Sequence, residues 1–205
     1  MAQTHAVLLK CSGAPPGDDV LLAALAEVGR RGAPGVAGLH AHAAENGGEL
    51  YAYLELREPA EMSAGYATRI AEIARGMAPL GGLAVQAARL ALQFDAAGAS
   101  SGERAPFHYV VETDAAEGWL DEMIRWYDRE HMPGLAAVPG CVRARRFVNQ
   151  DGGPRSLACY DLVARETLGS PPWLAVRGSA WSGRVRPNFR NTKRTMFRSL
   201  PRIAL

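Results

Sequence analysis

The sequence predicts an α+β protein built from two tandem units, each with the element order β-α-β-β-α-β. Three observations support this prediction. The same order of apolar runs and turns occurs twice in the 205 residues, a Pro-Gly pair at Pro34 and at Pro139 opens the second strand of each half, and a small, polar stretch separates the halves. We therefore expect an N-terminal domain over 1–95, a linker over 96–106 and a C-terminal domain over 107–205.

The first half begins with a strand at 5–9 and a helix over 18–31. Asp18 and Asp19 can cap this helix and Gly32 can end it, because aspartate accepts bonds from free backbone N–H groups and glycine disfavours the helix. An Asn-Gly turn then separates the second and third strands, since it tolerates the positive φ of a hairpin. The remaining expected elements are a strand over 50–56, a helix over roughly 63–77 and a strand over 85–94.

The second half repeats this order. We expect a helix over 116–130, in which apolar side chains lie at helical spacing. Pro133 should end this helix, because proline has no backbone N–H. The second helix should be short and interrupted, because prolines and glycines oppose it. The expected strands lie at 108–112, after Pro139-Gly140, over 157–163 and over about 191–200.

This order is that of the ferredoxin-like plait, a four-stranded antiparallel sheet with helices on one face. The uncovered face of such a half-apolar sheet cannot stay in contact with water. We therefore expect the two plaits to pack sheet to sheet as an α+β barrel, with a ligand-sized cavity between the sheets.

The composition, 48% hydrophobic and 21% charged, is that of a soluble globular protein. We find no basic and apolar leader typical of a secretory signal and no apolar run long enough to span a bilayer. The cysteines (Cys11, Cys141 and Cys159) are odd in number and lack metal-ligand spacing. We therefore expect a cytoplasmic protein with no membrane partner.

Basic residues are concentrated in the C-terminal half. The run Arg184–Arg202 could bind phosphate or nucleic acid, but few aromatic residues accompany it, so we expect a solvated surface and no nucleic-acid partner. His40 and His42 form a His-x-His pair for which His5 is the only evident third ligand, so we expect no metal site. We also expect no cofactor.

An ionisable cluster, Asp128, Glu130 and His131, stands beside the Pro-Gly pair of the second half only. Imidazole titrates near neutral pH, so His131 can act as a general acid or base, and Asp128 on the same helix face could orient the ring. The alternative is a histidine at a helix C-terminus that favours the helix dipole. Tyr127 could donate a hydrogen bond to a substrate carbonyl, although such aromatics, Trp126 included, more often pack in a core.

Arginines on the second strand of this half are candidate substrate ligands. Alternation of side chains puts Arg143 and Arg145 on the same face as Cys141 and opposite Arg146. An arginine that faces a cavity could clamp a carboxylate. A solvated or ion-paired arginine, for example one paired with Asp161, is the equal alternative.

The stretches Trp126–Leu135, Val138–Phe147 and Pro187–Phe197 resemble the EthD-like branch of the dimeric α+β barrel superfamily. The resemblance implies paired plaits that enclose pockets, as in cofactor-independent monooxygenases, polyketide cyclases, muconolactone-type isomerases and some haem enzymes. It also implies that His131 faces the pocket. The first half departs from this pattern, because Ala26 stands where the second half has His131, so we expect one functional pocket per chain.

Two functions are consistent with these features. The first is a small cofactor-independent enzyme of isomerase, cyclase, lyase or monooxygenase type, which acts on an apolar aromatic or polyketide-like carbonyl compound by histidine-mediated proton transfer. The second is a non-catalytic module that binds a small molecule or haem, or that drives oligomerisation. A homodimer is a further expectation. The expected site residues are His131, Asp128 and Tyr127 for catalysis and Arg145, Arg143, Glu130, His108 and Trp126 for substrate binding.

Overall fold

The computed structural model describes residues 3–32 and 35–205, so Pro34 of the first Pro-Gly pair lies outside the described residues. Contacts divide the chain into two units. The first unit holds Met1–Ala91, Asn149–Gly152 and Phe197–Leu205, and the second holds Leu92–Val148 and Gly153–Met196.

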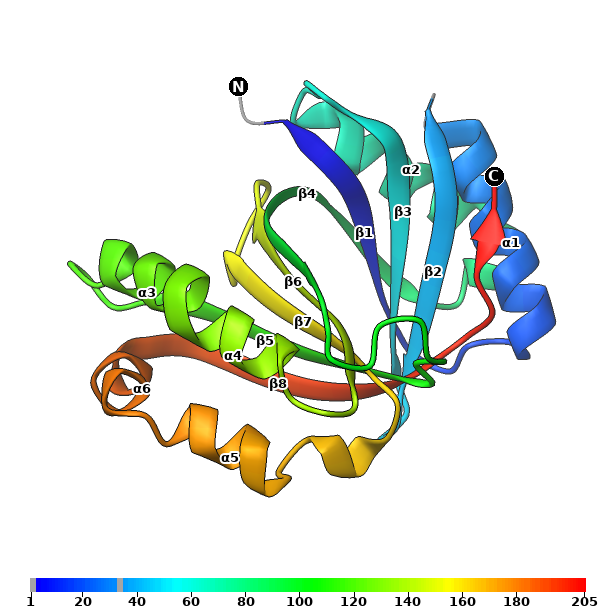
Figure 1. The fold of residues 1–205 in the computed structure, drawn as a ribbon. Helices are drawn as coiled ribbons and strands as arrows, with labels where there is room; N and C mark the ends of the chain where they lie inside the picture. Colours follow the sequence, from blue (N-terminus) through cyan, green and yellow to red (C-terminus); the bar gives the residue numbers. More distant parts are fainter. Residues whose placement is uncertain (1–2, 33–34) are drawn as a thin grey trace. The chain divides into compact units, whose positions relative to one another are not determined.

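The first unit has an antiparallel sheet with two helices packed on one face (Figure 1). Strand β1 pairs with both β3 and β4, and β2 pairs with β3, which gives the order β2-β3-β1-β4. This is the predicted ferredoxin-like plait. Its elements are β1 (Thr4–Ser12), α1 (Asp18–Gly32), β2 (Val36–Ala44), β3 (Glu49–Ala60), α2 (Gly65–Gly76) and β4 (Ala84–Ala97), with the short β9 (Ile203–Ala204) paired with β2.

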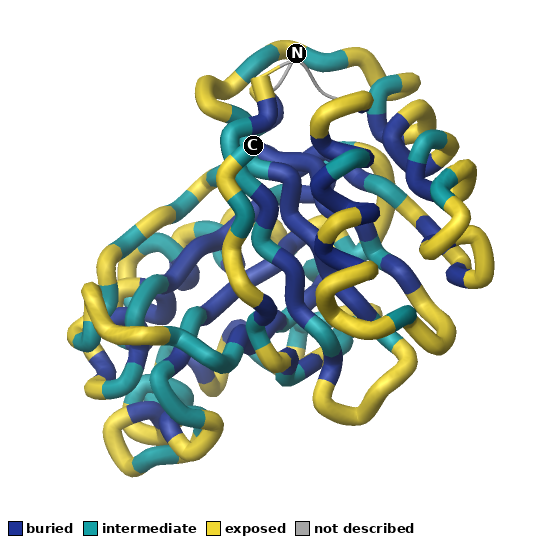
Figure 2. The backbone as a smooth tube through the Cα atoms, turned by 90° about the vertical axis from the view of Figure 1, so that its right-hand side faces the viewer, coloured by how far each residue is buried: buried dark blue, intermediate teal, exposed yellow. Residues whose placement is uncertain are grey.

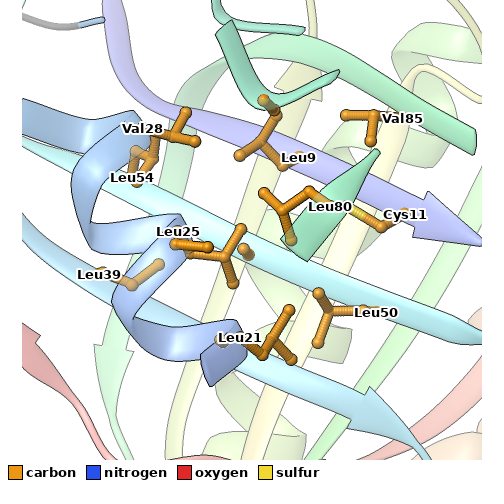
Figure 3. Close-up of a cluster of buried hydrophobic side chains, with 14 of the residues drawn as sticks. Leu9, Cys11, Leu21, Leu25, Val28, Leu39, Leu50, Leu54, Leu80 and Val85 are labelled. Carbon is orange, nitrogen blue, oxygen red and sulfur yellow. The ribbon is translucent and has the colours of Figure 1, made fainter. Parts of the chain in front are cut away.

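Helix α1 covers this sheet with one apolar stripe. Leu21, Leu25 and Val28 follow at helical spacing and lie against Leu50 and Leu54 of β3 (Figure 3). All of these side chains are buried. Replacing a buried leucine by alanine costs about 2–5 kcal/mol of stability, so this stripe is a main source of the unit's stability.

Gly32 ends α1, as predicted, and it also permits the close approach of α2. A Cβ atom at this position would lie 2.2 Å from the Cδ1 atom of Ile70. At the other end of α1, Asp18 and Asp19 occupy the first turn, where carboxylates interact favourably with the helix N-terminus.

The second unit has the same strand order. Strand β5 pairs with β7, β7 pairs with β6, and β8 lies beside β5, which gives the order β6-β7-β5-β8. Both units are therefore ferredoxin-like, and the predicted α+β class is confirmed. The elements are β5 (Phe107–Ala115), α3 (Leu120–Trp126), α4 (Met132–Ala136), β6 (Cys141–Asn149), β7 (Ser156–Leu162), α5 (Pro171–Arg177), α6 (Ala180–Val185) and β8 (Phe189–Ser199).

The beginning of the stretch predicted as a linker, 96–106, is hydrogen-bonded to β6 of the second unit. The N–H of Gly98 donates to the Val142 carbonyl at 2.8 Å. A Cβ atom at Gly98 would lie 2.0 Å from the Cys141 oxygen, so the close approach of the two backbones requires glycine here. The predicted domain boundaries themselves stay a prediction.

The prediction that Pro133 ends the helix expected over 116–130 is wrong. The chain forms α3, a π-helical turn (Tyr127–His131) and α4 in succession. Proline lacks the N–H that an α-helix would bond to the carbonyl four residues back. In the π-helical turn the N–H of Met132 reaches the Tyr127 carbonyl, five residues back, so the α-helical register is already broken before Pro133.

The second helix of this unit is interrupted, as predicted. Helix α5 ends at Arg177 and α6 begins at Ala180. Ser179 caps α6, because its hydroxyl accepts a hydrogen bond from the Ser182 N–H at 3.0 Å.

Strand β6 contains a bulge near its start, which corrects the predicted alternation. Its register against β7 shifts between Cys141 and Arg143. A bulge adds one residue to a strand, so the alternation of faces inverts across it. Cys141 therefore shares the helix-covered face with Ala144 and Arg146, and not the opposite face with Arg143 and Arg145.

Burial follows these elements. Figure 2 shows buried and exposed segments alternating along the backbone; β1, β6 and β7 are mostly buried, whereas few residues of β8 are. Within residues 3–32 and 35–205, no helix combines the length and the apolar character needed to cross a membrane.

Candidate functional site

A pocket lies inside the second unit, between its helices and the sheet that they cover. We expected His131 to face a cavity between two sheets, but its ring lines this pocket on the helix-covered side of one sheet. The pocket leaves a cavity of about 30 Å³. A cavity of this size holds one or two water molecules, so a larger ligand enters only if the rim moves.

The sheet side of the pocket is aromatic. Tyr109 of β5 and Tyr160 of β7 stack with their ring centroids 6.3 Å apart. Trp173 of α5 meets both rings edge to face, at 6.3 and 5.2 Å. Phe189 at the start of β8 completes this wall. Such a surface offers flat faces and edges on which a planar apolar ligand can pack.

The π-helical turn forms the opposite wall. His131 stacks on Trp126 with ring centroids 4.1 Å apart and an interplanar angle of 22°. In an α-helix, residues five apart in the sequence would point about 140° apart. The wider π-helical turn brings them to the same side, so the backbone irregularity itself creates the Trp126–His131 stack. Turns of this kind are frequent at functional sites.

His131 is buried and electrostatically unusual. Its side chain is 8% exposed, and its Nδ1 atom has no hydrogen-bond partner within the part of the chain that the structure describes. Burial lowers the pKa of His131 to about 3, and the positive charges of Arg186 and Arg177 lower it further in the same direction. The imidazole is therefore neutral at pH 7, not titrating near neutrality as we expected. A neutral ring can accept a proton or share a hydrogen bond, and it gains nothing from a helix dipole.

The predicted hydrogen bond between Asp128 and His131 is not formed. The Asp128 carboxylate pairs with Arg146 at 2.7 Å, and the Arg146 guanidinium lies 5.6 Å from the centroid of the Tyr127 ring. The predicted pairing assumed α-helical spacing of residues 128 and 131, which the π-helical turn removes. Arg146 is 2% exposed and was missed as a site residue, because the bulge in β6 is invisible in the alternation pattern.

Tyr127 and Trp126, both predicted as site residues, lie in the wall of the pocket. Both line the pocket and both are buried. Burial raises the pKa of Tyr127, so its hydroxyl stays protonated and can only donate or accept a hydrogen bond as a neutral group. The Trp126 Nε1–H donates to the Ser182 hydroxyl at 3.2 Å, which fixes the indole against α6.

Glu130 holds the π-helical turn to α6 and is not part of the pocket lining. Its carboxylate accepts a hydrogen bond from the Ser179 hydroxyl at 2.6 Å. Since Ser179 also caps α6, this contact links the two helical segments.

The remaining predicted substrate ligands lie on the other face of the sheet or at its edge, away from the pocket. The His108 Nδ1 atom lies 2.6 Å from a carboxylate oxygen of Asp161, and Arg145 reaches the same carboxylate at 3.7 Å. Arg143 pairs with Asp95 at 2.6 Å. The structure therefore does not bring Arg143, Arg145 or His108 together with His131, and the ion pair with Asp161 that we weighed for an arginine is present.

Three other arginines line the pocket instead: Arg177 of α5, Arg186 of the short 3₁₀ turn before β8, and Arg194 of β8. Burial lowers the pKa of Arg186, and the charges of Arg177 and Arg194 lower it further. Two of these residues belong to the basic run that we assigned to a solvated surface. No local pattern distinguishes them from their neighbours, because they meet only in the folded unit.

The residues that the structure describes contain no group of three or more histidine, cysteine, aspartate or glutamate side chains able to hold a metal ion. His40 lies 3.1 Å from Glu55, and His42 lies 3.1 Å from the Ser199 hydroxyl. The pocket also does not fit haem. Its cavity of about 30 Å³ is far too small for the macrocycle.

No family model matches the sequence, and no curated protein matches it. Solved structures do match. An anthrone oxidase-like protein is similar over 98% of this chain and 93% of its own, with a TM-score of 0.65 and 12% identity. A protein from Lactobacillus acidophilus NCFM named "putative monooxygenase" is similar over 98% and 99%, with a TM-score of 0.62 and 11% identity. A chlorite dismutase mutant from Candidatus Nitrospira defluvii is similar over 95% and 91%, with a TM-score of 0.58 and 8% identity.

At these identities the likeness concerns the fold alone. It confirms the fold expected from the sequence across nearly the whole chain. Proteins of this fold carry different names and chemistries, so the function must be argued from the pocket. The EthD-like branch and the tandem origin of the two units stay predictions.

Proposed function

We propose that this protein is a small cofactor-independent enzyme of monooxygenase type, which acts on an enolisable aromatic carbonyl compound. The observation that carries the proposal is the neutral His131 imidazole, buried with an unpartnered Nδ1 atom in the wall of an aromatic pocket. The names of two structures that share the fold, anthrone oxidase-like and monooxygenase, favour oxygenation over isomerase, cyclase or lyase chemistry.

The reaction begins with a proton transfer. His131 accepts a proton from the acidic C–H group of the substrate, and the electron pair stays on the substrate as an enolate. The enolate carbon then forms a bond to dioxygen, and the proton returns from His131 to give a hydroperoxide. Loss of water leaves a new carbonyl group. One substrate and one dioxygen therefore give one oxidised product and one water.

The chain supports this step in three ways. Arg177 and Arg186 stabilise the negative charge that develops on the substrate oxygen. Tyr127, whose pKa burial raises, donates a neutral hydrogen bond to the same oxygen. The Asp128–Arg146 pair holds the π-helical turn and so positions His131 without touching the substrate.

The test is oxygen uptake with anthrone as the first substrate, together with product analysis. We expect His131→Gln to lower kcat/KM by about 100- to 10,000-fold, the usual contribution of a positioned acid or base. Tyr127→Phe should lower it by about tenfold, the worth of one hydrogen bond. His5→Gln, a histidine of β1 in the first unit, is the control and should keep full activity. Equal turnover by wild type and His131→Gln would exclude the proposed role.

A non-catalytic binding module is the second candidate. The observation that favours it is the low pKa of His131, about 3, which makes the ring a weak base in the unliganded pocket. A carrier would be stabilised against heat by its ligand and would release it unchanged. Product analysis after incubation in air therefore separates the two candidates.

We also propose a cytoplasmic location and a homodimer. The first is supported by Cys11, Cys141 and Cys159, which are all buried and carry thiols, not disulfides. Sedimentation equilibrium of the purified protein tests the second.

A further inference from the structure

Three guanidinium groups surround one pocket, and no carboxylate lines it. Arg177, Arg186 and Arg194 come from three different elements and all contribute to the pocket lining. Among the described residues, none of the three has an aspartate or glutamate within ion-pair distance. Within residues 3–32 and 35–205, these three side chains make a single hydrogen bond, from the Arg186 Nη1 atom to the Arg177 carbonyl at 3.5 Å.

Other arginines of the same unit contrast with this arrangement. Arg143 pairs with Asp95 at 2.6 Å, Arg146 with Asp128 at 2.7 Å and Arg125 with Glu122 at 2.7 Å. Arginines elsewhere in the unit therefore pair with carboxylates, whereas the arginines of the pocket do not. Like charges that converge on a half-enclosed cavity repel one another and create a positive potential inside it. The lowered pKa values of Arg186 and His131 are consistent with that potential.

The other property of the pocket is its aromatic lining. The rings of Tyr109, Trp173 and Phe189 line the cavity, and Tyr109 and Trp173 meet edge to face. Such walls favour a flat ring, and guanidinium groups favour an oxyanion, to which they can donate two parallel hydrogen bonds. A ligand that carries its oxyanion directly on an aromatic ring satisfies both preferences.

We infer that this pocket binds aromatic anions, with a carboxylate or an ionised phenol or enol held by Arg177, Arg186 and Arg194 and the ring packed against the aromatic wall. The inference rests on the proposed function in one respect, since it names the substrate class of the same pocket. It also gives the arginines a chemical role: by stabilising the conjugate base of a neutral substrate, they favour transfer of its proton to His131.

Entry of the ligand depends on the same arginines. The cavity of about 30 Å³ is smaller than an aromatic ring. Arg177 and Arg186 are partly exposed and Arg194 is exposed, so their long side chains can swing outward without disturbing the core. An anion that enters removes their mutual repulsion, and the guanidinium groups can then close over it.

The experiment compares two probes of similar shape, 1-naphthoate and the uncharged 1-naphthamide, by isothermal titration calorimetry on the full chain. We expect naphthoate to bind about ten- to hundredfold more tightly, the worth of one hydrogen bond between charged groups. Arg186→Gln and Arg194→Gln should each remove most of this preference, and Arg186→Lys should keep part of it. Arg184→Gln is the matched control, since this exposed arginine lies two residues away and outside the pocket lining.

Equal affinity for the two probes would overturn the inference, and so would an unchanged preference in Arg194→Gln, whose side chain is exposed in the wild type. The two proposals fail differently. Arginine-dependent binding of naphthoate without turnover of any enolisable compound would refute the enzyme and keep the anion site. Turnover that depends on His131 but shows no preference for anions would refute the anion site and keep the enzyme.

Discussion

The pKa of His131 predicts how the protein's stability depends on pH. The folded protein holds this imidazole with a pKa of about 3, against 6.5 for an unperturbed histidine. Between these two values the unfolded chain binds a proton that the folded chain does not. Protons therefore favour unfolding, and the free energy of unfolding falls as the pH falls from 6.5 toward 3.

The magnitude follows from the width of that window. Each pH unit contributes about 1.4 kcal/mol, so at pH 4.5, two units below 6.5, the burial of His131 alone should cost about 3 kcal/mol relative to pH 7. Urea unfolding at pH 7 and at pH 4.5 measures the loss in wild type and in His131→Gln. Titrating carboxylates contribute to both proteins alike, so the difference between the two losses isolates His131.

The variant should therefore lose about 3 kcal/mol less than wild type on acidification. If wild type and His131→Gln lose the same amount, the imidazole is not held neutral by burial, and the electrostatic description of the pocket is wrong.

Two further variants test neighbouring features. Gly140→Ala should lower the free energy of unfolding in urea by about 2–4 kcal/mol, because Gly140 has φ +93° and a Cβ atom there would lie 2.3 Å from the Thr167 hydroxyl oxygen. Gly152→Ala is the control, since nothing lies within 4 Å of a Cβ atom there, and equal losses in the two variants would contradict the steric argument. Asp128→Asn should cost about 1–3 kcal/mol, because it leaves the buried Arg146 without its counter-charge while the carboxylate itself is 37% exposed; an unchanged unfolding midpoint would show that the pair contributes nothing.

The strand order and the helices of the first unit could be predicted because their signals are local. Helix α1 has carboxylates at its start, one apolar stripe and a glycine at its end, and all three features act within a few residues. The strand order then followed from a pattern that occurs twice. The elements within each plait are set by such short-range signals, so these signals were sufficient to predict them.

The geometry of the π-helical turn could not be predicted in this way. A sequence reading assigns α-helical spacing to residues 128 and 131, and it assigns the end of the helix to Pro133. In the structure the extra residue per turn separates Asp128 from His131 and continues the helix past the proline. Pro133 is the one sequence feature that could have indicated the irregular turn, because a helix that continues past a proline lacks one backbone hydrogen bond.

The side of the sheet on which the candidate pocket lies could also not be predicted from the sequence. Arg145 and His108 were expected to be pocket residues because a bare sheet face was expected to enclose the ligand. Both pair with Asp161 on the face opposite the pocket. The arginines that do line the pocket, Arg177 and Arg194, belong to separate elements and converge only through tertiary packing.

The central claim is that the helix-covered pocket of the second unit, with the neutral His131 in its wall, is the ligand site. Nuclear Overhauser contacts between bound 1-naphthoate and protein protons test it most directly. We predict contacts from the ring protons of the ligand to His131 and Tyr109, with His131 chemical shifts of a neutral imidazole from pH 8 down to pH 5. Contacts to His108 on the opposite face, or a His131 ring that gains a proton near pH 6, would contradict the account.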